Sequence, residues 1–179
     1  MTSRVLAILD VFDAAHTRLT DFFRQSFDMF NDVIGTDDPD LSAFRDAGGK
    51  VLIWHGWNDP LIFPEGSVDY YEAVLDAFHS TTLVQRVALF FLAPGLGHCG
   101  GGPGPNQFDM FGALVDWVER GEPPDQIIAT RVESGEIVRT RPICAYRYVA
   151  RYDGVGNPDL AASFDCRPNY ASWGTQNRH

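Results

Sequence analysis

The sequence lacks several features that mark large classes of protein. It has no apolar run of about 18 residues, so we expect no segment that spans a membrane. Basic residues are scarce: 14 lysines and arginines stand against 24 aspartates and glutamates, which gives a net charge of −10. Such a chain repels phosphate groups, so we expect neither nucleic acids nor anionic membranes among its partners.

Metal-binding and phosphate-binding motifs are also missing. The sequence contains no His-Glu-x-x-His and no paired Cys-x-x-Cys, so we expect no zinc site. Asp153, Asp159 and Asp165 are spread over one stretch without the spacing of a calcium-binding EF-hand. The glycine-rich stretch 100–105 lacks the Gly-Lys-Ser/Thr ending of a phosphate-binding loop. We therefore expect no metal and no cofactor in this chain.

Two short segments, Val51–Asp59 and Ala88–Cys99, contain most of the residues that indicate a function. Each begins as an apolar run typical of a strand buried on both faces, and each then breaks at glycine. Asp59 ends the first segment and His98 lies near the end of the second. In a parallel α/β sheet both side chains would lie at the carboxyl edge, where ligands bind. Aspartate followed by histidine is the order of the acid and base in an α/β-hydrolase triad.

The nucleophile of such a triad is not found. A Gly-x-Ser-x-Gly elbow should precede the acid, but Ser3, Ser26 and Ser42 are the only serines before Asp59 and none has the flanking glycines. We therefore interpret the chain as the acid-and-base half of a serine hydrolase. The size of the chain, 179 residues with 45% hydrophobic composition, is sufficient for one domain with a core.

Several motifs resemble the tannase and feruloyl esterase family. They are Gly48–Ile62, Pro94–Gly102, Arg139–Tyr146, Ala150–Gly154 and Ala161–Cys166, and the likeness runs from about residue 37 to about residue 168. The resemblance implies part of an α/β-hydrolase fold, with a mostly parallel sheet, that cleaves esters of small aromatic acids such as gallate and ferulate. It assigns Asp59 as the acid and His98 as the general base. The serine-bearing half and the family's lid, which holds a calcium site, have no counterpart in this sequence.

The same resemblance implies a role for each of the three cysteines. It implies a disulfide between Cys144 and Cys166, and it makes Cys99 a half-cystine whose partner is missing. The family is exported, secreted or periplasmic, and disulfides fit an oxidising compartment. The first residues, however, do not predict a signal peptide, because Asp10 and Asp13 interrupt the apolar stretch. The location of the chain is therefore left undetermined.

Periodicity predicts the following organisation. Residues 1–36 form an N-terminal helical segment, with a helix over 4–34; residues 37–168 form the C-terminal part of the catalytic domain; residues 169–179 are a polar tail. Within the second region we expect strands at Lys50–Trp54 and Arg86–Leu92, a helix at Pro64–Phe78, a helix that Asn106 caps and that runs to about Arg120, and short extended pieces at Ile127–Val132 and Ile137–Thr140. The apolar stripe of the first helix packs into a core, or stays open if a missing half covers it.

Each candidate residue also has a simpler interpretation, which for His98 is an exposed loop histidine without a catalytic role. Asp59 lies in a Trp-Asn-Asp-Pro turn, where an aspartate commonly bonds its own backbone. His55 and Trp57 could line the substrate side of the site, or bond and pack locally. Cys99 is a poor nucleophile candidate, because side chains of adjacent extended residues point apart and His98 cannot readily deprotonate its neighbour.

Two functions from different classes follow. The first is an aromatic ester hydrolase, present as a portion that we expect to be inactive alone. The alternative is a non-catalytic chain that docks with a separate serine-bearing half.

Overall fold

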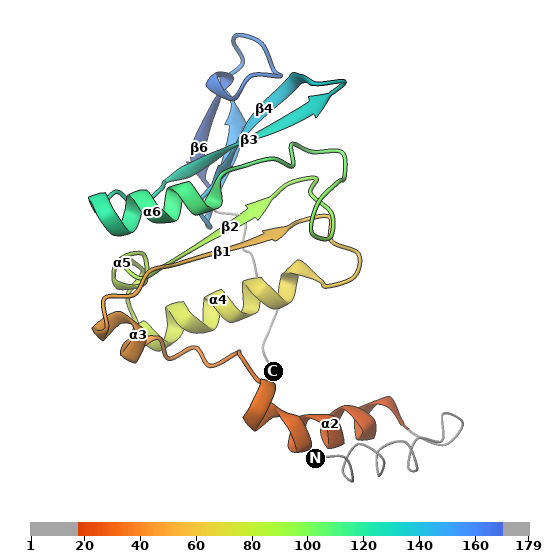
Figure 1. Ribbon diagram of the computed structural model, residues 1–179, viewed down its shortest axis with the longest axis vertical. Helices are drawn as coiled ribbons and strands as arrows, with labels where there is room; N and C mark the ends of the chain where they lie inside the picture. The colour runs from red at the N-terminus through yellow and green to blue at the C-terminus, as the bar shows by residue number, and fades with distance from the viewer. Residues whose placement is uncertain (1–17, 170–179) are drawn as a thin grey trace. The chain divides into compact units, whose positions relative to one another are not determined.

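The computed structural model describes residues 18–169. The chain divides into a part that ends at Asp38 and a part that begins at Pro39. In chain order the elements are α2 (Leu19–Ile34), α3 (Ser42–Asp46), β1 (Val51–Gly56), α4 (Pro64–Phe78), α5 (Thr81–Val84), β2 (Ala88–Ala93), α6 (Met110–Arg120), β3 (Gln126–Glu133), β4 (Glu136–Cys144), β5 (Tyr148–Tyr152), the 3-10 helix η1 (Ala161–Ser163) and β6 (Phe164–Pro168) (Figure 1). None of the helices within the described range is long and apolar enough to cross a membrane.

Helix α2 is the described portion of the helix expected over 4–34, and residues 4–17 lie outside the described range. It is amphipathic, and the rings of Phe23 and Phe27 lie one turn apart with centroids 6.3 Å from each other. No residue of α2 is buried, so the expected core packing of this stripe is not found. The first part of the described chain contains no second element that could cover the stripe.

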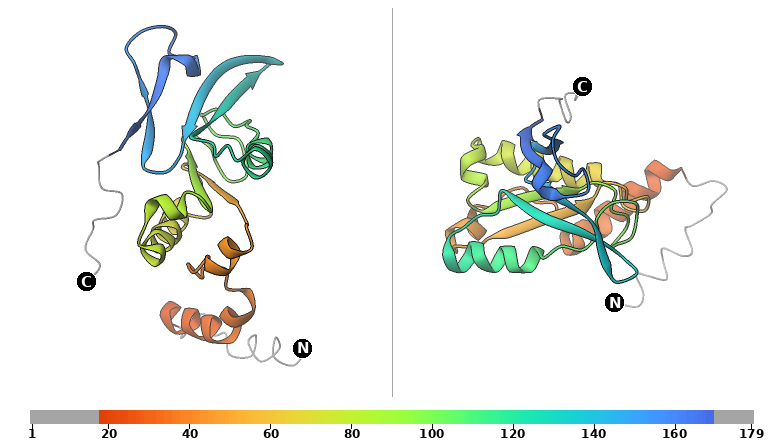
Figure 2. Two further views of the ribbon diagram at one scale, coloured as in Figure 1. Left: turned by 90° about the vertical axis from the view of Figure 1, so that its left-hand side faces the viewer. Right: turned by 90° about the horizontal axis from the view of Figure 1, so that it is seen from above.

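Strands β1 and β2 form a parallel pair, in register from Val51 opposite Ala88 to Gly56 opposite Ala93. Successive residues of β2 face two separate cores, as the two-residue period of a strand requires. Phe90 packs with α4, whereas Phe91 packs with Trp117 of α6 and with the β3–β4 hairpin. Helices α4 and α6 therefore cover opposite faces of the pair, which both views of Figure 2 show.

Strand β1 differs from the expectation of a strand buried on both faces. Trp54 is 41% exposed, and its ring meets Phe108 edge-on at 5.2 Å between centroids. Within residues 18–169, β1 pairs only with β2, so its outer edge has no neighbouring strand to cover the adjacent side chains. Both strands also end later than predicted, at Gly56 and Ala93 instead of Trp54 and Leu92.

Helix α6 ends where predicted, at Arg120, but Asn106 is not its N-cap. The backbone N–H groups of Asn106 and Gln107 both donate to the carbonyl oxygen of Thr130, at 3.0 and 3.1 Å, which holds this segment extended against β3. The helix begins only after Asp109, whose carboxylate accepts the N–H of Gly112 at 2.7 Å as an N-cap. Because residues 106 and 107 pair with β3, the helix starts further along the chain, at Met110.

The pieces expected at 127–132 and 137–140 are the centres of a longer antiparallel hairpin, β3–β4, which turns at Ser134 and Gly135. Beyond β4 the chain pairs with the free edge of β2: the N–H of Tyr146 donates to the carbonyl of Phe90 at 2.7 Å. Strand β2 is thus paired on both edges. Strands β5 and β6, with η1 before β6, were not predicted and form a second antiparallel hairpin. Parallel pairing is confined to β1 and β2 among the described strands, so the expected mostly parallel sheet is not found.

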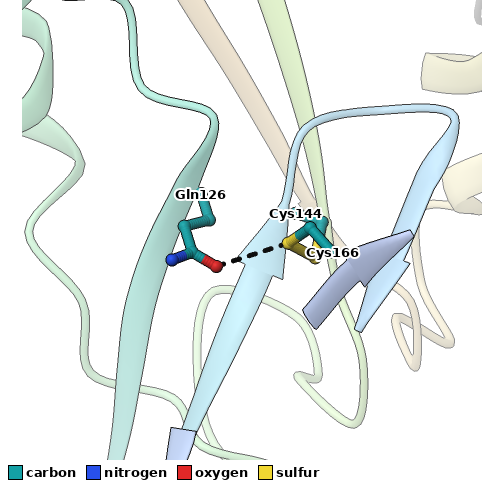
Figure 3. Close-up of a disulfide and its surroundings, with 3 residues drawn as sticks. All are labelled: Gln126, Cys144 and Cys166. Atoms are coloured by element: carbon teal, nitrogen blue, oxygen red, sulfur yellow. Dashed lines mark hydrogen bonds between the residues drawn. A yellow bond between two sulfur atoms is a disulfide. The ribbon is translucent and has the colours of Figure 1, made fainter. Parts of the chain in front are cut away.

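A disulfide between Cys144 and Cys166 joins the end of β4 to β6 (Figure 3). The side-chain oxygen of Gln126, the first residue of β3, lies 3.4 Å from the sulfur of Cys166. The bond therefore fixes the β5–β6 hairpin beside the start of β3. Cys99 is a free, exposed thiol.

We expect the double substitution of Cys144 and Cys166 by alanine to lower the free energy of unfolding by about 3 kcal/mol, because the bond closes a loop between residues 22 positions apart. Urea unfolding followed by circular dichroism measures this loss. As a control, a thiol reagent should detect one thiol per unreduced native chain and three after reduction and unfolding. Three reactive thiols without reduction would show that the bond is not formed.

Candidate active site

The turn after β1 positions Asp59. The N–H of Trp57 donates to the carbonyl of Ala93, and the N–H of Asn58 donates to the carbonyl of Leu96, both at 2.9 Å. These bonds hold the turn against the loop that follows β2. A Cβ on Gly56 would lie 2.5 Å from the carbonyl oxygen of Leu96, so this approach requires glycine. The carboxyl ends of the two strands are thereby joined.

The carboxylate of Asp59 is buried and fully engaged. Its Oδ1 accepts the backbone N–H groups of Leu61 at 2.9 Å and Ile62 at 3.0 Å. This is the local turn that an aspartate commonly makes with its own backbone. Its Oδ2 points the other way and meets two histidines. Both the turn bond and the contact with His98 are therefore present in one side chain, each through its own oxygen.

His98 lies in the loop after β2 and is the closer of the two histidines. Its Nδ1 lies 2.8 Å from Oδ2 of Asp59, and its side chain is 35% exposed against 5% for the aspartate. A carboxylate only accepts hydrogen bonds, so Nδ1 carries the proton. In the neutral ring Nε2 then has the lone pair, and it is the nitrogen available to take a proton from a substrate-side group.

His55, the other histidine, is the last residue but one of β1. Its Nε2 lies 3.3 Å from Oδ2 of Asp59 and 3.0 Å from the carbonyl oxygen of Ile62, and its Nδ1 lies 2.7 Å from Oγ of Ser67. Of the two roles weighed for His55, the structure describes local hydrogen bonding. Sequence reasoning did not single out Ser67, which gives no motif signal because it is 12 residues away on α4.

The pKa of Asp59 is lowered by these contacts. Burial acts to raise the pKa, but it is outweighed by hydrogen bonds from His98, from the N–H groups of Ile62 and Leu61, and from His55. The pKa of this carboxyl therefore lies well below its ordinary range. Asp59 is an anion at neutral pH, able to fix the orientation of His98 and to stabilise the imidazolium that forms when His98 accepts a proton.

Trp57 precedes Asp59 by two residues, and Cys99 directly follows His98. Trp57 packs against the core cluster that contains Tyr71 and Phe90, and it lines a cavity of about 360 Å³ together with Pro94 and Tyr148. Cys99 is exposed and has a left-handed backbone, with φ of 56°. In the described residues no hydrogen bond joins His98 to a serine hydroxyl, and no three or more His, Cys, Asp and Glu side chains are grouped as metal ligands.

Asp59 and His98 follow the carboxyl ends of two adjacent parallel strands, the position that the sequence motifs predicted for them. The sequence profile of the tannase and feruloyl esterase family matches residues 4–167. The chain belongs to this family. Its relatives are esterases and hydrolases of esters, so the resemblance noted from the motifs is confirmed.

Two relatives give the extent of the likeness. The chain is 45% identical over 135 residues to the mono(2-hydroxyethyl) terephthalate hydrolase of Piscinibacter sakaiensis, which covers 74% of this chain and 22% of the relative. It is 38% identical over 167 residues to a protein described as "Probable feruloyl esterase" from Arthroderma benhamiae, which covers 91% of this chain and 31% of the relative. The chain thus spans about a fifth to a third of the length of these relatives.

A solved structure supports the fold. The crystal structure of feruloyl esterase B from Aspergillus oryzae superposes with a TM-score of 0.78 at 28% sequence identity, over 88% of this chain and 34% of that one. An esterase from the same species gives a TM-score of 0.77 at 30% identity. These neighbours are of the α/β-hydrolase class, and the mixed α/β structure of this family member is consistent with part of such a domain.

Proposed function

We propose that this chain supplies the acid and the base of a carboxylic ester hydrolase that works through a serine nucleophile. The observation that supports this most directly is the 2.8 Å contact between Nδ1 of His98 and Oδ2 of Asp59, at the carboxyl ends of adjacent parallel strands. That geometry leaves Nε2 of His98 with a lone pair, on a side chain that is 35% exposed. No third group in the described residues competes for that nitrogen.

The mechanism follows from these positions. Nε2 of His98 takes the proton of the serine hydroxyl as its oxygen attacks the ester carbonyl, and the imidazolium is stabilised by the Asp59 anion. The same proton then passes from Nε2 to the leaving alcohol as the carbon–oxygen bond breaks. Nε2 of His98 next takes a proton from water as the water oxygen attacks the acyl carbon, and it returns this proton to the serine oxygen as the bond between that oxygen and the acyl carbon breaks and the acid is released. Backbone N–H groups near the serine would hold the oxyanion.

The substrate class that we propose is an ester of a small aromatic acid. The relatives are named for ferulate, tannin and terephthalate, all of which contain aromatic acids. Trp57, beside the acid, provides an aromatic surface at this edge of the sheet. We propose that the serine and the rest of the binding site come from sequence outside these 179 residues, and that the chain alone does not turn over substrate.

A chimera tests this proposal. In it, this chain replaces the matching part of the Aspergillus oryzae feruloyl esterase B, whose remaining sequence provides the serine-bearing half. We expect the chimera to hydrolyse methyl ferulate, whereas this chain alone and the remaining half alone do not. A folded chimera without activity would reject the proposal, and so would turnover of methyl ferulate by this chain alone.

The second candidate, a module that docks with a separate serine-bearing chain, is favoured by the unpaired outer edge of β1 among the described strands. The two halves of the chimera, mixed as separate chains, distinguish it. Activity that appears on mixing supports docking, whereas activity only in the fused chain argues against it.

A further inference from the structure

We propose that His55, held by Ser67, is a positioning residue that fixes the carboxylate of Asp59 for its contact with His98. The proposal deepens the function proposed above and rests on it. It concerns four side chains that contact one another in series: Ser67 contacts His55, His55 contacts Asp59, and Asp59 contacts His98. Two of these residues come from β1 and its turn, one from α4 and one from the loop after β2.

The protonation of His55 follows from its partners. Its Nε2 faces only acceptors, the carboxylate of Asp59 at 3.3 Å and the carbonyl oxygen of Ile62 at 3.0 Å. That nitrogen must therefore carry a proton. In the neutral ring Nδ1 is then an acceptor, and it takes the hydroxyl proton of Ser67 at 2.7 Å. A serine at this position, able to donate or accept, keeps the ring in the orientation that aims Nε2–H at Asp59.

His55 is not placed to act on substrate itself. Both of its ring nitrogens have partners within the protein, and its side chain is 13% exposed, compared with 35% for His98. Its effect on a reaction must therefore pass through Asp59. Because the aspartate side chain is 5% exposed, its hydrogen bonds lie where water does not readily replace a lost partner.

The two histidines make unequal contacts with the same oxygen. The contact of His98 is short at 2.8 Å and that of His55 is long at 3.3 Å, so His55 draws little of the acceptor strength away from His98. Its larger effect is geometric. His55 contacts Asp59 and the carbonyl of Ile62 in the segment after β1, and it contacts Ser67 in α4. These contacts connect the two segments and limit rotation of the Asp59 carboxylate. The N–H groups of Leu61 and Ile62 still hold Oδ1 when His55 is removed, so we expect a partial loss of function.

The first test determines the tautomer of His98 in this chain by NMR, and it does not require the chain to be an active enzyme. Long-range proton–nitrogen correlation spectra at alkaline pH distinguish the protonated from the bare ring nitrogen. In the wild-type chain His98 should be wholly in the Nδ1–H form. In the His55→Ala variant we expect the chemical shifts of the two ring nitrogens of His98 to converge. A less firmly held Asp59 carboxylate allows His98 to adopt the other tautomer as well. His55→Gln should restore the wild-type shifts, since its amide N–H can replace Nε2–H.

Ser67→Ala keeps the imidazole and removes only the group that orients it, so it should produce a smaller convergence of the His98 shifts. This variant decides the question if His55→Ala does not fold. His79→Asn is the matched control: His79 lies at the end of α4 in a left-handed conformation that asparagine tolerates, and it should leave the His98 shifts unchanged. Wild-type shifts for His98 in the folded His55→Ala and Ser67→Ala variants would overturn the proposal.

In the active chimera His55→Ala should lower kcat by about ten- to a hundredfold with KM unchanged, as expected for a supporting partner of a catalytic group. His55→Gln should recover most of the loss. The two measurements separate the two proposals. An inactive chimera with His98 shifts that respond as expected rejects the ester hydrolase function and leaves the positioning intact. An active chimera whose kcat is unaffected by His55→Ala rejects the positioning alone.

Discussion

In the chimera, Asp59→Asn is expected to lower kcat by about four orders of magnitude. Asparagine has the same shape, and its oxygen can still accept the N–H groups of Leu61 and Ile62. Its amide nitrogen then occupies the position of Oδ2 and presents N–H to His98. The imidazole responds by placing its proton on Nε2, and in that tautomer it cannot accept the proton of the serine. Initial rates of methyl ferulate hydrolysis measure the loss.

Asp116→Asn is the matched control for this prediction. Asp116 is a carboxylate on α6 that pairs with Arg120 at 3.0 Å on an exposed surface, and its removal should leave kcat within about twofold because exposed pairs contribute little. Circular dichroism confirms that both variants are folded. A folded Asp59→Asn chimera with less than a tenfold loss would exclude Asp59 as the acid of the triad.

The second large effect is on stability. We expect Phe90→Ala to lower the free energy of unfolding by about 3–5 kcal/mol, the range for removing a fully buried aromatic ring. Phe90 is 0% exposed at the centre of β2, and its ring lies 5.5 Å from that of Tyr71 and 5.4 Å from that of Tyr146. Alanine leaves a cavity between α4 and the segment after β4. Urea unfolding monitored by circular dichroism gives the difference.

Phe111→Ala provides the comparison, because this phenylalanine is 77% exposed on α6. Its loss should change the free energy of unfolding by no more than about 0.5 kcal/mol. If Phe90→Ala does not fold, Phe90→Leu should fold with a smaller loss, since leucine fills part of the space. A Phe90→Ala variant as stable as Phe111→Ala would contradict the described core.

The parts of the structure that the sequence predicted are those determined by local patterns. Helix α4 begins at a proline and has one apolar face, and it was expected at its observed bounds. The apolar runs that became β1 and β2 break at glycine, which indicated that Asp59 and His98 follow strand ends. The sequence therefore predicted both residues that meet at 2.8 Å, although it could not give the distance.

The remaining features depend on contacts between residues far apart in the chain. The start of α6 moved to Met110 because Gln107 pairs with Thr130, a residue that no helix signal indicates. Hairpin β5–β6 is half-exposed and lacks strong alternation, so its strands gave little signal. The contact of His55 with Ser67 likewise depends on how α4 packs beside β1, which periodicity does not specify.

The unequal pairing of β1 and β2 has a consequence for hydrogen exchange. Strand β2 has partners on both edges, so when β1 separates only the β2 amides that face β1 should exchange, while those that face the segment after β4 stay protected. Strand β1 has one partner among the described strands and can separate from β2 at a lower free energy. His98 therefore follows the more persistent strand and Asp59 the less persistent one. We therefore expect the opening of β1 to set the lifetime of the Asp59–His98 contact in this chain, and a neighbouring strand along its outer edge to lengthen that lifetime.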